Sequence, residues 1–229
     1  MSASQDVRLN PVDFADWQLL PQRAIWWPLR SMLIVSDLHL GKAAHFRKHG
    51  IAVPNAVNAD TLQRLDQLIT QFKPRNVLVL GDLFHSEENE EWQEFRAWLM
   101  GLHAGGVVQS FRLVEGNHDI LPPSAFEGLP MERCTSWTEG PFVFAHDPAE
   151  LKGLGEGMVG VAGHLHPAVS MRGKGRQSLK LPCWWYHRNN GVLVVPTFGA
   201  FTGSVSVSPS KQDLCWVTTG EAVIAVPVS

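Results

Sequence analysis

Apolar runs and helical patterns alternate in the first half of the chain. Residues 32–35 and 77–80 are continuous apolar runs that stop at a polar residue or a glycine, as buried strands do. Between them, apolar residues recur every three or four positions from residue 59 to 72, which predicts an amphipathic helix that ends before Pro74. A strand, a helix and a strand form a βαβ unit, so we expect the two strands to be parallel and to finish at the same edge of one sheet.

The rest of the chain adds one more helical pattern and then becomes rich in strands. Acidic residues after residue 86 open a second predicted helix, whose apolar stripe ends near Leu102. Further apolar runs predict strands at 107–114, 142–145, 158–162, 192–195, 205–207, 214–217 and 222–226. The first 30 residues are expected to form a strand-like segment packed on the body. Because the chain has no internal repeat and no low-complexity linker, residues 1–229 should form a single α/β domain.

Polar side chains follow five of the predicted strands, at the point where each strand ends. Asp37 and His39 follow the first strand, and side chains two apart on an extended backbone point the same way, so the pair could converge on one ion. An isolated pair of this kind is more often a capping Asp beside a surface His. Here, however, polar groups recur at strand ends that should share one edge, where ligands bind in α/β sheets. The set is Asp37, His39, Asp82, Asn117, His118, His146, His164 and His166.

The chemistry of this set points to metal ions. Carboxylate, imidazole and amide oxygen ligands suit Mn²⁺, Fe and Zn²⁺ better than metals that prefer thiolates. A set of this size with one shared carboxylate is enough for two ions. Two ions about 3.5–4 Å apart clamp both oxygens of an in-line displacement at phosphorus. The pattern therefore predicts a binuclear metal centre that hydrolyses a phosphate ester.

Composition restricts the possible partners and compartments. The net charge of −3 and the isoelectric point of about 6.3 provide no bulk attraction for nucleic acid or membrane, so nucleic-acid binding would need a local patch. Three dispersed cysteines without a CxxC spacing favour a reducing cytoplasm. The N-terminus lacks a basic region followed by an apolar run, and no apolar stretch approaches the roughly 18 residues of a membrane span, so we expect a cytoplasmic protein with no membrane association.

Two short basic segments could supply a local patch. Lys42 lies just after the first polar motif and could contact a phosphate, although a solvated turn would also explain it. The segment at 172–180 alternates charge and glycine as a hairpin turn does, and its side chains Arg172, Lys174 and Arg176 could bind a nucleic-acid backbone. An ordinary charged hairpin is the alternative. We favour the phosphate role for this loop, because an acidic protein that acts on a polymer needs a local cationic surface.

The polar motifs resemble those of a known enzyme family. The series Asp37-x-His39, Gly81-Asp82, Gly116-Asn117-His118-Asp119, His146 and Gly163-His164-x-His166 is similar to the signature of calcineurin-like metallophosphoesterases. The resemblance implies an α/β fold of four layers, a two-sheet β-sandwich flanked by helices on both outer faces. It implies a first metal held by Asp37, His39 and His166, with Asp82 as the bridge. The second metal would be held by Asn117, His146 and His164. His118 would protonate or stabilise the leaving group, oriented by Asp119.

A longer stretch resembles one branch of that family. Residues 40–42, 162–167, 181–183 and 196–203 are similar to bacterial ligase-associated DNA damage response endonucleases of the PdeM type. This resemblance implies a DNA endonuclease that uses manganese, favours single strands and works beside an ATP-dependent DNA ligase, a helicase and an exonuclease. Residues 81–86 also resemble the corresponding motif of other DNA-repair nucleases, which places His85 near the scissile phosphate. The turn at 198–203 either borders the active site or merely reverses the chain.

Two other functions share these residues. A small-molecule phosphoesterase that acts on nucleotides, cyclic nucleotides or nucleotide-lipids would use the same metal ligands, but it needs a closed pocket where a nuclease needs an open basic cleft. A catalytically idle scaffold that binds partner proteins would typically have lost ligands or the acid, whereas this chain keeps them. The basic loop at 172–180 and the length of the resemblance favour the endonuclease.

Overall fold

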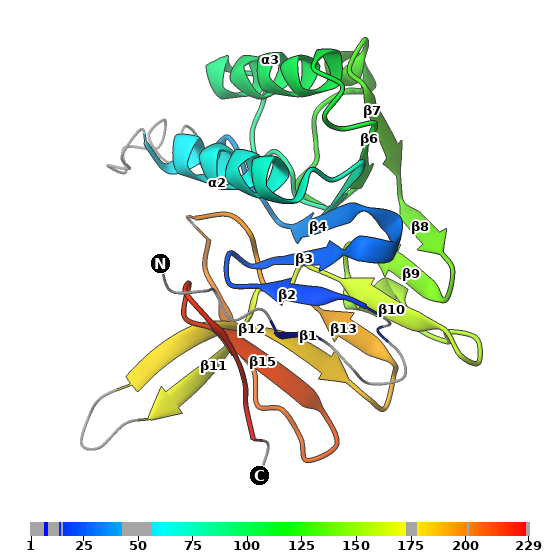
Figure 1. Cartoon of the computed structure of the whole chain (residues 1–229), viewed down its shortest axis with the longest axis vertical. Coiled ribbons are helices and arrows are strands. Elements are labelled where there is room, and N and C mark those ends of the chain that lie inside the picture. Colours follow the sequence, from blue (N-terminus) through cyan, green and yellow to red (C-terminus); the bar gives the residue numbers. More distant parts are fainter. Residues whose placement is uncertain are drawn as a thin grey trace.

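Two β-sheets form the body of the molecule (Figure 1). The computed structural model describes residues 7–8, 14, 16–42, 56–172, 178–200 and 202–227. The first sheet has seven strands in chain order: β1 (Val7–Arg8), β2 (Gln18–Leu20), β3 (Ala24–Trp27), β4 (Met32–Ser36), β5 (Asn76–Leu80), β6 (Ser110–Val114) and β7 (Met131–Cys134). Strands β1 to β4 pair antiparallel, and β4 to β7 pair parallel, which confirms the predicted βαβ unit.

The second sheet is built from the remaining strands. Its order is β14-β11-β12-β13-β10-β9-β8, with β15 paired to β12 and β16 paired to β15. The bounds are β8 (Ser136–Glu139), β9 (Phe142–Ala145), β10 (Val159–Ala162), β11 (Pro167–Arg172), β12 (Ser178–His187), β13 (Val192–Val194), β14 (Val205–Ser206), β15 (Leu214–Thr218) and β16 (Val223–Ala225). Strand β10 pairs parallel with both β9 and β13, so these three strands end at the same edge.

An apolar core with many aromatic rings fills the space between the two sheets. Inward residues of the first sheet, such as Ile34 and Leu78, pack there with Phe142 and Phe144 of the second sheet. The ring of Trp17 lies 4.4 Å from that of Phe142, centroid to centroid. The described residues among the first 30 therefore contribute strands and core side chains, as expected from the sequence. Alternate residues of the same strands point outward, which is the period-two pattern of a sheet buried on both faces.

The helices α2 (Ala56–Phe72) and α3 (Glu90–Ala104) cover the outer face of the first sheet (Figure 1). Leu65 and Ile69 of α2 and Phe95 of α3 are buried against that face. The side chain of Asn89 caps α3 by accepting a hydrogen bond from the backbone N–H of Trp92 at 3.1 Å. Neither of these helices is long and apolar enough to cross a membrane.

The outer face of the second sheet differs from the expectation of helices on both outer faces. In the described part of the chain, this face is covered by a single 3₁₀ turn at Pro148–Glu150 and by Leu151 and Leu154, which pack on Ala162 and its neighbours. The connection from β9 to β10 contains a proline and three glycines within 13 residues, and these residues disfavour a longer helix. The two-sheet sandwich itself is confirmed.

Candidate metal centre

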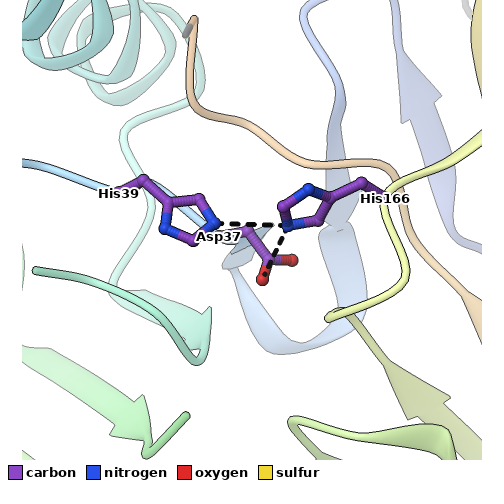
Figure 2. Close-up of side chains that lie close together, drawn as sticks. All are labelled: Asp37, His39 and His166. Atoms are coloured by element: carbon purple, nitrogen blue, oxygen red, sulfur yellow. Dashed lines mark hydrogen bonds and ion pairs between the residues drawn. The ribbon is translucent and has the colours of Figure 1, made fainter. Parts of the chain in front are cut away.

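The carboxyl ends of strands from both sheets bring a first group of three side chains together. Asp37 and His39 follow β4, and His166 follows β10 (Figure 2). The Nε2 atom of His166 lies 3.3 Å from Oδ1 of Asp37 and 3.3 Å from Nε2 of His39. The three ligand atoms of this group lie within 4.8 Å of one another, which is close enough for one ion to contact all of them.

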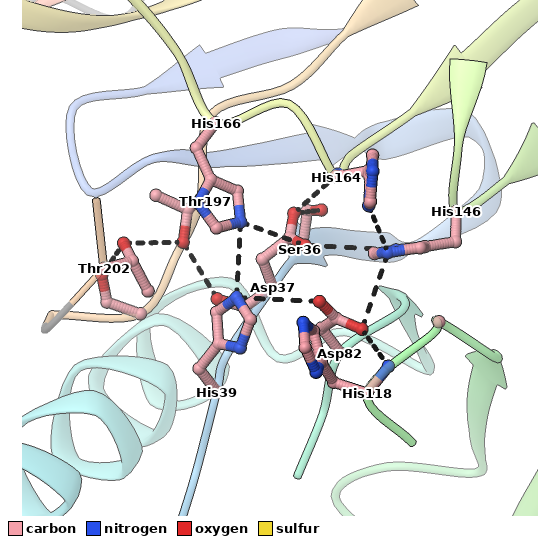
Figure 3. A network of polar contacts seen from close by, with 12 residues as sticks. Ser36, Asp37, His39, Asp82, His118, His146, His164, His166, Thr197 and Thr202 are labelled. Atoms are coloured by element: carbon pink, nitrogen blue, oxygen red, sulfur yellow. Dashed lines mark hydrogen bonds and ion pairs between the residues drawn. The ribbon is translucent and has the colours of Figure 1, made fainter. Parts of the chain in front are cut away.

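A second group shares Asp37 with the first. It comprises Asp37, Asp82 and His146, whose ligand atoms also lie within 4.8 Å of one another. The Nε2 atom of His146 is 3.5 Å from Oδ1 of Asp82, 3.1 Å from Oδ1 of Asn117 and 3.0 Å from Nδ1 of His164. Figure 3 shows the contacts of His146 with Asp82 and His164 within one polar network. All seven side chains that the sequence singled out as ligands therefore lie in one cluster.

Asp82 lies between the two groups. Its Oδ2 is 3.7 Å from Nε2 of His39, and its Oδ1 is 3.5 Å from Nε2 of His146 (Figure 3). This placement suits a carboxylate shared by two ions. Asp37 also faces both groups, because its Oδ1 lies 3.9 Å from Nδ1 of His146 as well as near His166. The sequence singled out Asp82 for sharing, and the structure offers Asp37 as a second shared carboxylate.

The backbone around these residues is not extended, which corrects the reasoning that made Asp37 and His39 converge. The strand ends at Ser36, and Asp37 and His39 have left-handed conformations with φ of 52° and 49°. Asp82, His164 and His166 also have positive φ, at 48°, 65° and 47°. Such conformations are uncommon for residues other than glycine, and they concentrate at functional sites. Tight turns, and not the alternation of a strand, point these side chains into the cluster.

Two glycines of the motifs allow the close packing. A Cβ atom on Gly163 would lie 1.8 Å from Oγ of Ser36 and 2.5 Å from Oδ2 of Asp37. A Cβ atom on Gly81, whose φ is 75°, would lie 2.0 Å from Nδ1 of His146. The glycines before Asp82 and His164 are therefore required by the approach of a ligand side chain, and this approach joins the two sheets at the site.

Backbone carbonyls fix which nitrogen of two imidazoles faces the site. Nδ1 of His146 lies 3.1 Å from the carbonyl oxygen of Leu80, and Nδ1 of His166 lies 3.0 Å from that of Gly203. A carbonyl can only accept a hydrogen bond, so each Nδ1 donates and each Nε2 presents its lone pair to the cluster. Burial lowers the pKa of His39 to about 2, which keeps this imidazole neutral and able to act as a ligand.

The donor set fits divalent cations. Oδ2 of Asp37 accepts hydrogen bonds from Oγ of Ser36 and from the backbone N–H of His164, the latter at 3.1 Å. Oδ1 of Asp37 is buried and has no hydrogen-bond donor within the described part of the chain. Nε2 of His166, whose lone pair faces the site, lies 3.3 Å from this oxygen, and Nε2 of His146 lies 3.5 Å from Oδ1 of Asp82 and 3.1 Å from Oδ1 of Asn117, so an acceptor faces an acceptor in each pair. A cation bound here would accept electron pairs from these acceptor atoms, which the hydrogen bonds of the site leave without a donor.

His85 and His118 lie beside the cluster, where the site reaches the surface. Their rings are 3.9 Å apart between centroids, and Nδ1 of His85 is 3.3 Å from Nδ1 of His39. The backbone N–H of His118 donates to Oδ1 of Asp82 at 2.9 Å. Both rings are half-exposed, so both can meet a substrate that approaches from solvent. Their catalytic roles stay predictions.

Asp119 acts on the backbone of the loops that carry these groups. Its Oδ1 accepts from the N–H groups of Leu83 and Phe84 at 2.8 and 3.2 Å, and its Oδ2 accepts from that of Gly116 at 2.8 Å. Burial raises the pKa of Asp119 to about 6, although these hydrogen bonds oppose the shift. Asp119 thereby links the loop after β5 to the loop after β6, which carries His118. An orienting effect on His118 would act through this turn.

The proposed substrate-binding cations are only partly described. Lys42 is half-buried, and burial lowers its pKa while the carboxylates of Asp82 and Asp37 oppose that change. The predicted hairpin is confirmed by the antiparallel pairing of β11 and β12. The side chains of Arg172, Lys174 and Arg176 lie outside the described residues, so their contact with phosphate stays a prediction.

Two residues that support the site were not singled out from the sequence. The hydroxyl of Ser36 donates to Asp37, and the Oγ1 of Thr197 donates to the backbone carbonyl of Asp37 at 2.9 Å. Ser36 stands directly before the first polar motif, and Thr197 lies in the segment 196–203 that the family resemblance covered. Their positions beside these motifs were the only signal in the sequence that could have identified the two residues. The partner of each hydroxyl is known only from the tertiary contacts. The turn at 198–203 does border the site, because the carbonyl of Gly203 contacts His166.

Comparison with known proteins identifies a family and similar solved structures. The sequence profile of the family described as calcineurin-like phosphoesterase matches residues 31–204. Among solved structures, the nuclease MPE of Pseudomonas putida is similar at 25% sequence identity and a TM-score of 0.72, over 97% of this chain and 99% of that chain. The phosphoesterase YfcE of E. coli is similar at 15% identity and a TM-score of 0.45, over 86% of this chain and 99% of that chain. No curated protein matches the chain.

Proposed function

This chain belongs to the calcineurin-like phosphoesterase family, and on that premise we propose that it is a two-metal DNA endonuclease that favours single strands and acts in DNA repair. The observation that carries the proposal is the cluster of seven candidate metal ligands at one edge of both sheets, with His85 and His118 beside it. The nuclease part is supported by the similarity to the Pseudomonas putida nuclease, which extends over 97% of the chain.

The residues divide into two sets of ligands. Asp37, His39 and His166 would hold the first ion, and Asn117, His146 and His164 would hold the second. Asp82 would contact both. When bound, two divalent cations polarise phosphoryl oxygens, lower the pKa of water and stabilise the charge that develops in the transition state. We propose Mn²⁺ as the native ion, with Fe or Zn²⁺ as alternatives, since oxygen and imidazole donors suit all three.

His118 is proposed as the general acid. A sugar alkoxide is a poor leaving group, so its departure requires a proton, and general acid catalysis is typically worth about 10²–10⁴-fold in rate. The hydrogen bond from the backbone of His118 to Asp82 keeps the residue beside the metal ligands, and its half-exposed ring is free to face the leaving oxygen. His85, whose ring lies against that of His118, would contact the scissile phosphate.

A polymeric substrate is favoured by the way the donor set reaches the surface. Asn117 is exposed, and His164 and His166 are half-exposed, so the outer ligands are accessible to a strand that passes across the edge of the sheets. Lys42 and the cations Arg172, Lys174 and Arg176 would neutralise backbone phosphates. The PdeM-like motifs support functional association with an ATP-dependent DNA ligase, a helicase and an exonuclease.

A substrate panel tests the proposal. The metal-free protein is reconstituted with Mn²⁺ and assayed on single-stranded DNA, duplex DNA, RNA, cyclic nucleotides and phosphomonoesters, with Asp82→Asn as the blank. We expect internal cleavage of single-stranded DNA that requires Mn²⁺ and is absent from the blank. Hydrolysis of cyclic nucleotides alone would replace the endonuclease with the small-molecule phosphoesterase. Activity that persists in EDTA, or in the blank, would refute the two-metal reaction.

A further inference from the structure

The segment that follows β13 bends back over the first group of metal ligands. The backbone N–H of Phe198 donates to the carbonyl oxygen of Ser36 at 2.7 Å, and that of Gly199 donates to the carbonyl oxygen of Asp37 at 3.0 Å. The hydroxyl of Thr197 donates to the same Asp37 oxygen at 2.9 Å. The carbonyl of Asp37 therefore has two donors, which fix the orientation of the peptide in the left-handed turn. We call residues 197–200 with 202–203 the brace.

The other end of the brace reaches the second residue of the group. The carbonyl oxygen of Gly203 accepts from Nδ1 of His166 at 3.0 Å, so Nε2 of this imidazole points to Asp37. Inside the brace, Oγ1 of Thr202 lies 3.1 Å from Oγ1 of Thr197, which connects the two ends (Figure 3). One short segment thus contacts both Asp37 and His166 from behind, on the side away from the ligand atoms.

The brace is itself held by parts of the fold that are far apart in sequence. The guanidinium group of Arg64, in α2, donates to the carbonyl oxygen of Phe198 and lies 4.3 Å from the centroid of the Phe198 ring. Nη1 of Arg23, between β2 and β3, donates to the carbonyl oxygen of Gly199 at 3.4 Å. The backbone N–H of Ala200 donates to Oγ1 of Thr61 at 3.3 Å. These contacts make the brace a fixed support, because each of its central peptides is bonded to a buried or half-buried partner.

We propose that the brace is a positioning element for the first metal, and that Thr197 is its central residue. Thr197 and Gly199 hold Asp37 in the left-handed conformation that aims Oδ1 at the site, and the Gly203 carbonyl sets the tautomer of His166. The two groups share Asp37, but the brace also contacts His166, which belongs to the first group alone, whereas His146 of the second group is held by the carbonyl of Leu80. Loss of the brace should therefore weaken one metal site more than the other. The inference rests on the proposed two-metal centre.

Metal binding tests this role without recourse to activity. Apo protein is titrated with Mn²⁺ by isothermal calorimetry, and bound Mn²⁺ is followed by electron paramagnetic resonance. Thr197→Val removes the hydroxyl and keeps the shape, whereas Thr197→Ser keeps the hydroxyl. Thr218→Val is the matched control, because Thr218 is equally buried, at 3% exposure against 4% for Thr197, and its hydroxyl donates to the carbonyl of Pro21 at 2.7 Å and not to a candidate ligand.

The expected result is a selective loss. Thr197→Val should weaken one of the two Mn²⁺ sites about 10–100-fold, the usual effect of removing a residue that orients a ligand. Thr197→Ser should restore most of the affinity, and Thr218→Val should bind both ions as the wild type does. If Thr197→Val does not fold, the half-exposed Thr202→Val replaces it, with a smaller loss at the same site expected.

Three outcomes would overturn the role of the brace. Wild-type affinity at both sites in Thr197→Val and Thr202→Val would show that the hydroxyls do not position Asp37. An equal loss in Thr218→Val would show a general effect of stability. If Thr197→Ser fails to restore binding, the loss of Mn²⁺ affinity in Thr197→Val does not arise from the missing hydrogen bond. If the wild type binds no Mn²⁺, the proposed function and the brace fail together, whereas the first three outcomes leave the proposed function intact.

Discussion

Substitution of Gly81 by alanine should disable the second metal site by displacing one side chain. The added Cβ atom would lie 2.0 Å from Nδ1 of His146 and 2.5 Å from its Cγ. Ordinary contact requires about 3.4 Å or more, so the ring must retreat by roughly 1.4 Å. Gly81 sits in the loop bonded to Asp37, and His146 is buried at 2% exposure, so neither can move freely. We therefore expect the imidazole to leave both the Leu80 carbonyl and its metal-binding position.

The loss of folding stability in Gly81→Ala has two separable causes. Alanine at a φ of 75° costs about 1–2 kcal/mol in backbone strain. Loss of the hydrogen bond from His146 removes one donor from the carbonyl of Leu80, which keeps Oγ of Ser36 at 3.1 Å, and adds about 0.5–1.5 kcal/mol of destabilisation. For catalysis, a misplacement of about 1 Å typically costs on the order of 100-fold. A fall of that size in kcat/KM corresponds to about 2.7 kcal/mol of lost transition-state stabilisation.

Gly128→Ala separates the strain from the clash. Gly128 has a φ of 74°, nearly that of Gly81, but a Cβ atom there would meet nothing within 4 Å. Both variants should lose stability in thermal unfolding, with the larger loss for Gly81→Ala. Only Gly81→Ala should lose one of two bound Mn²⁺ ions and about 100-fold or more in Mn²⁺-dependent cleavage of a diester. Two ions and full activity in Gly81→Ala would refute the close approach of His146 as the reason for this glycine.

Three further predictions concern single residues. Asp82→Asn should abolish turnover and weaken both Mn²⁺ sites in calorimetry, because the two oxygens of Asp82 face both groups, and full activity would show that it is not shared. His118→Ala should slow cleavage of DNA by about 10²–10⁴-fold but that of an activated aryl diester far less, and an equal loss on both would remove the acid role. Burial raises the pKa of Asp119 from 3.8 to about 6, so the ionised carboxylate destabilises the folded state. The stabilising contribution of the protonated carboxyl group is fully present below about pH 4 and is lost as the pH rises through 6. In EDTA, the unfolding free energy of the wild type should therefore fall relative to that of Asp119→Asn by up to about 3 kcal/mol between about pH 4 and 7, and a difference that grows with pH would contradict the shift.

The sequence located the site because its signal is local. Each candidate ligand stands at the end of an apolar run, and parallel strands joined by a helix place such ends at one edge. This reasoning identified Asp37, Asp82 and His146 before any contact was known, and the structure places all three within one group. The sandwich of two sheets was predictable from family resemblance, and the order of the strands was not, because pairing joins residues far apart in the chain.

Tertiary structure alone decided how the side chains are aimed and supported. The left-handed conformations of Asp37 and His39 are uncommon for these residue types, and they persist because contacts with the loop after β5 and with the brace hold them. The partner of Thr197 lies 160 positions away in sequence, and no periodicity in a single chain encodes such a contact. The sequence by itself thus determined which residues could bind metal and where the strands deliver them. The fold determined which atoms face the ions, because tautomers, φ angles and buried hydrogen bonds depend on neighbours brought together only by folding.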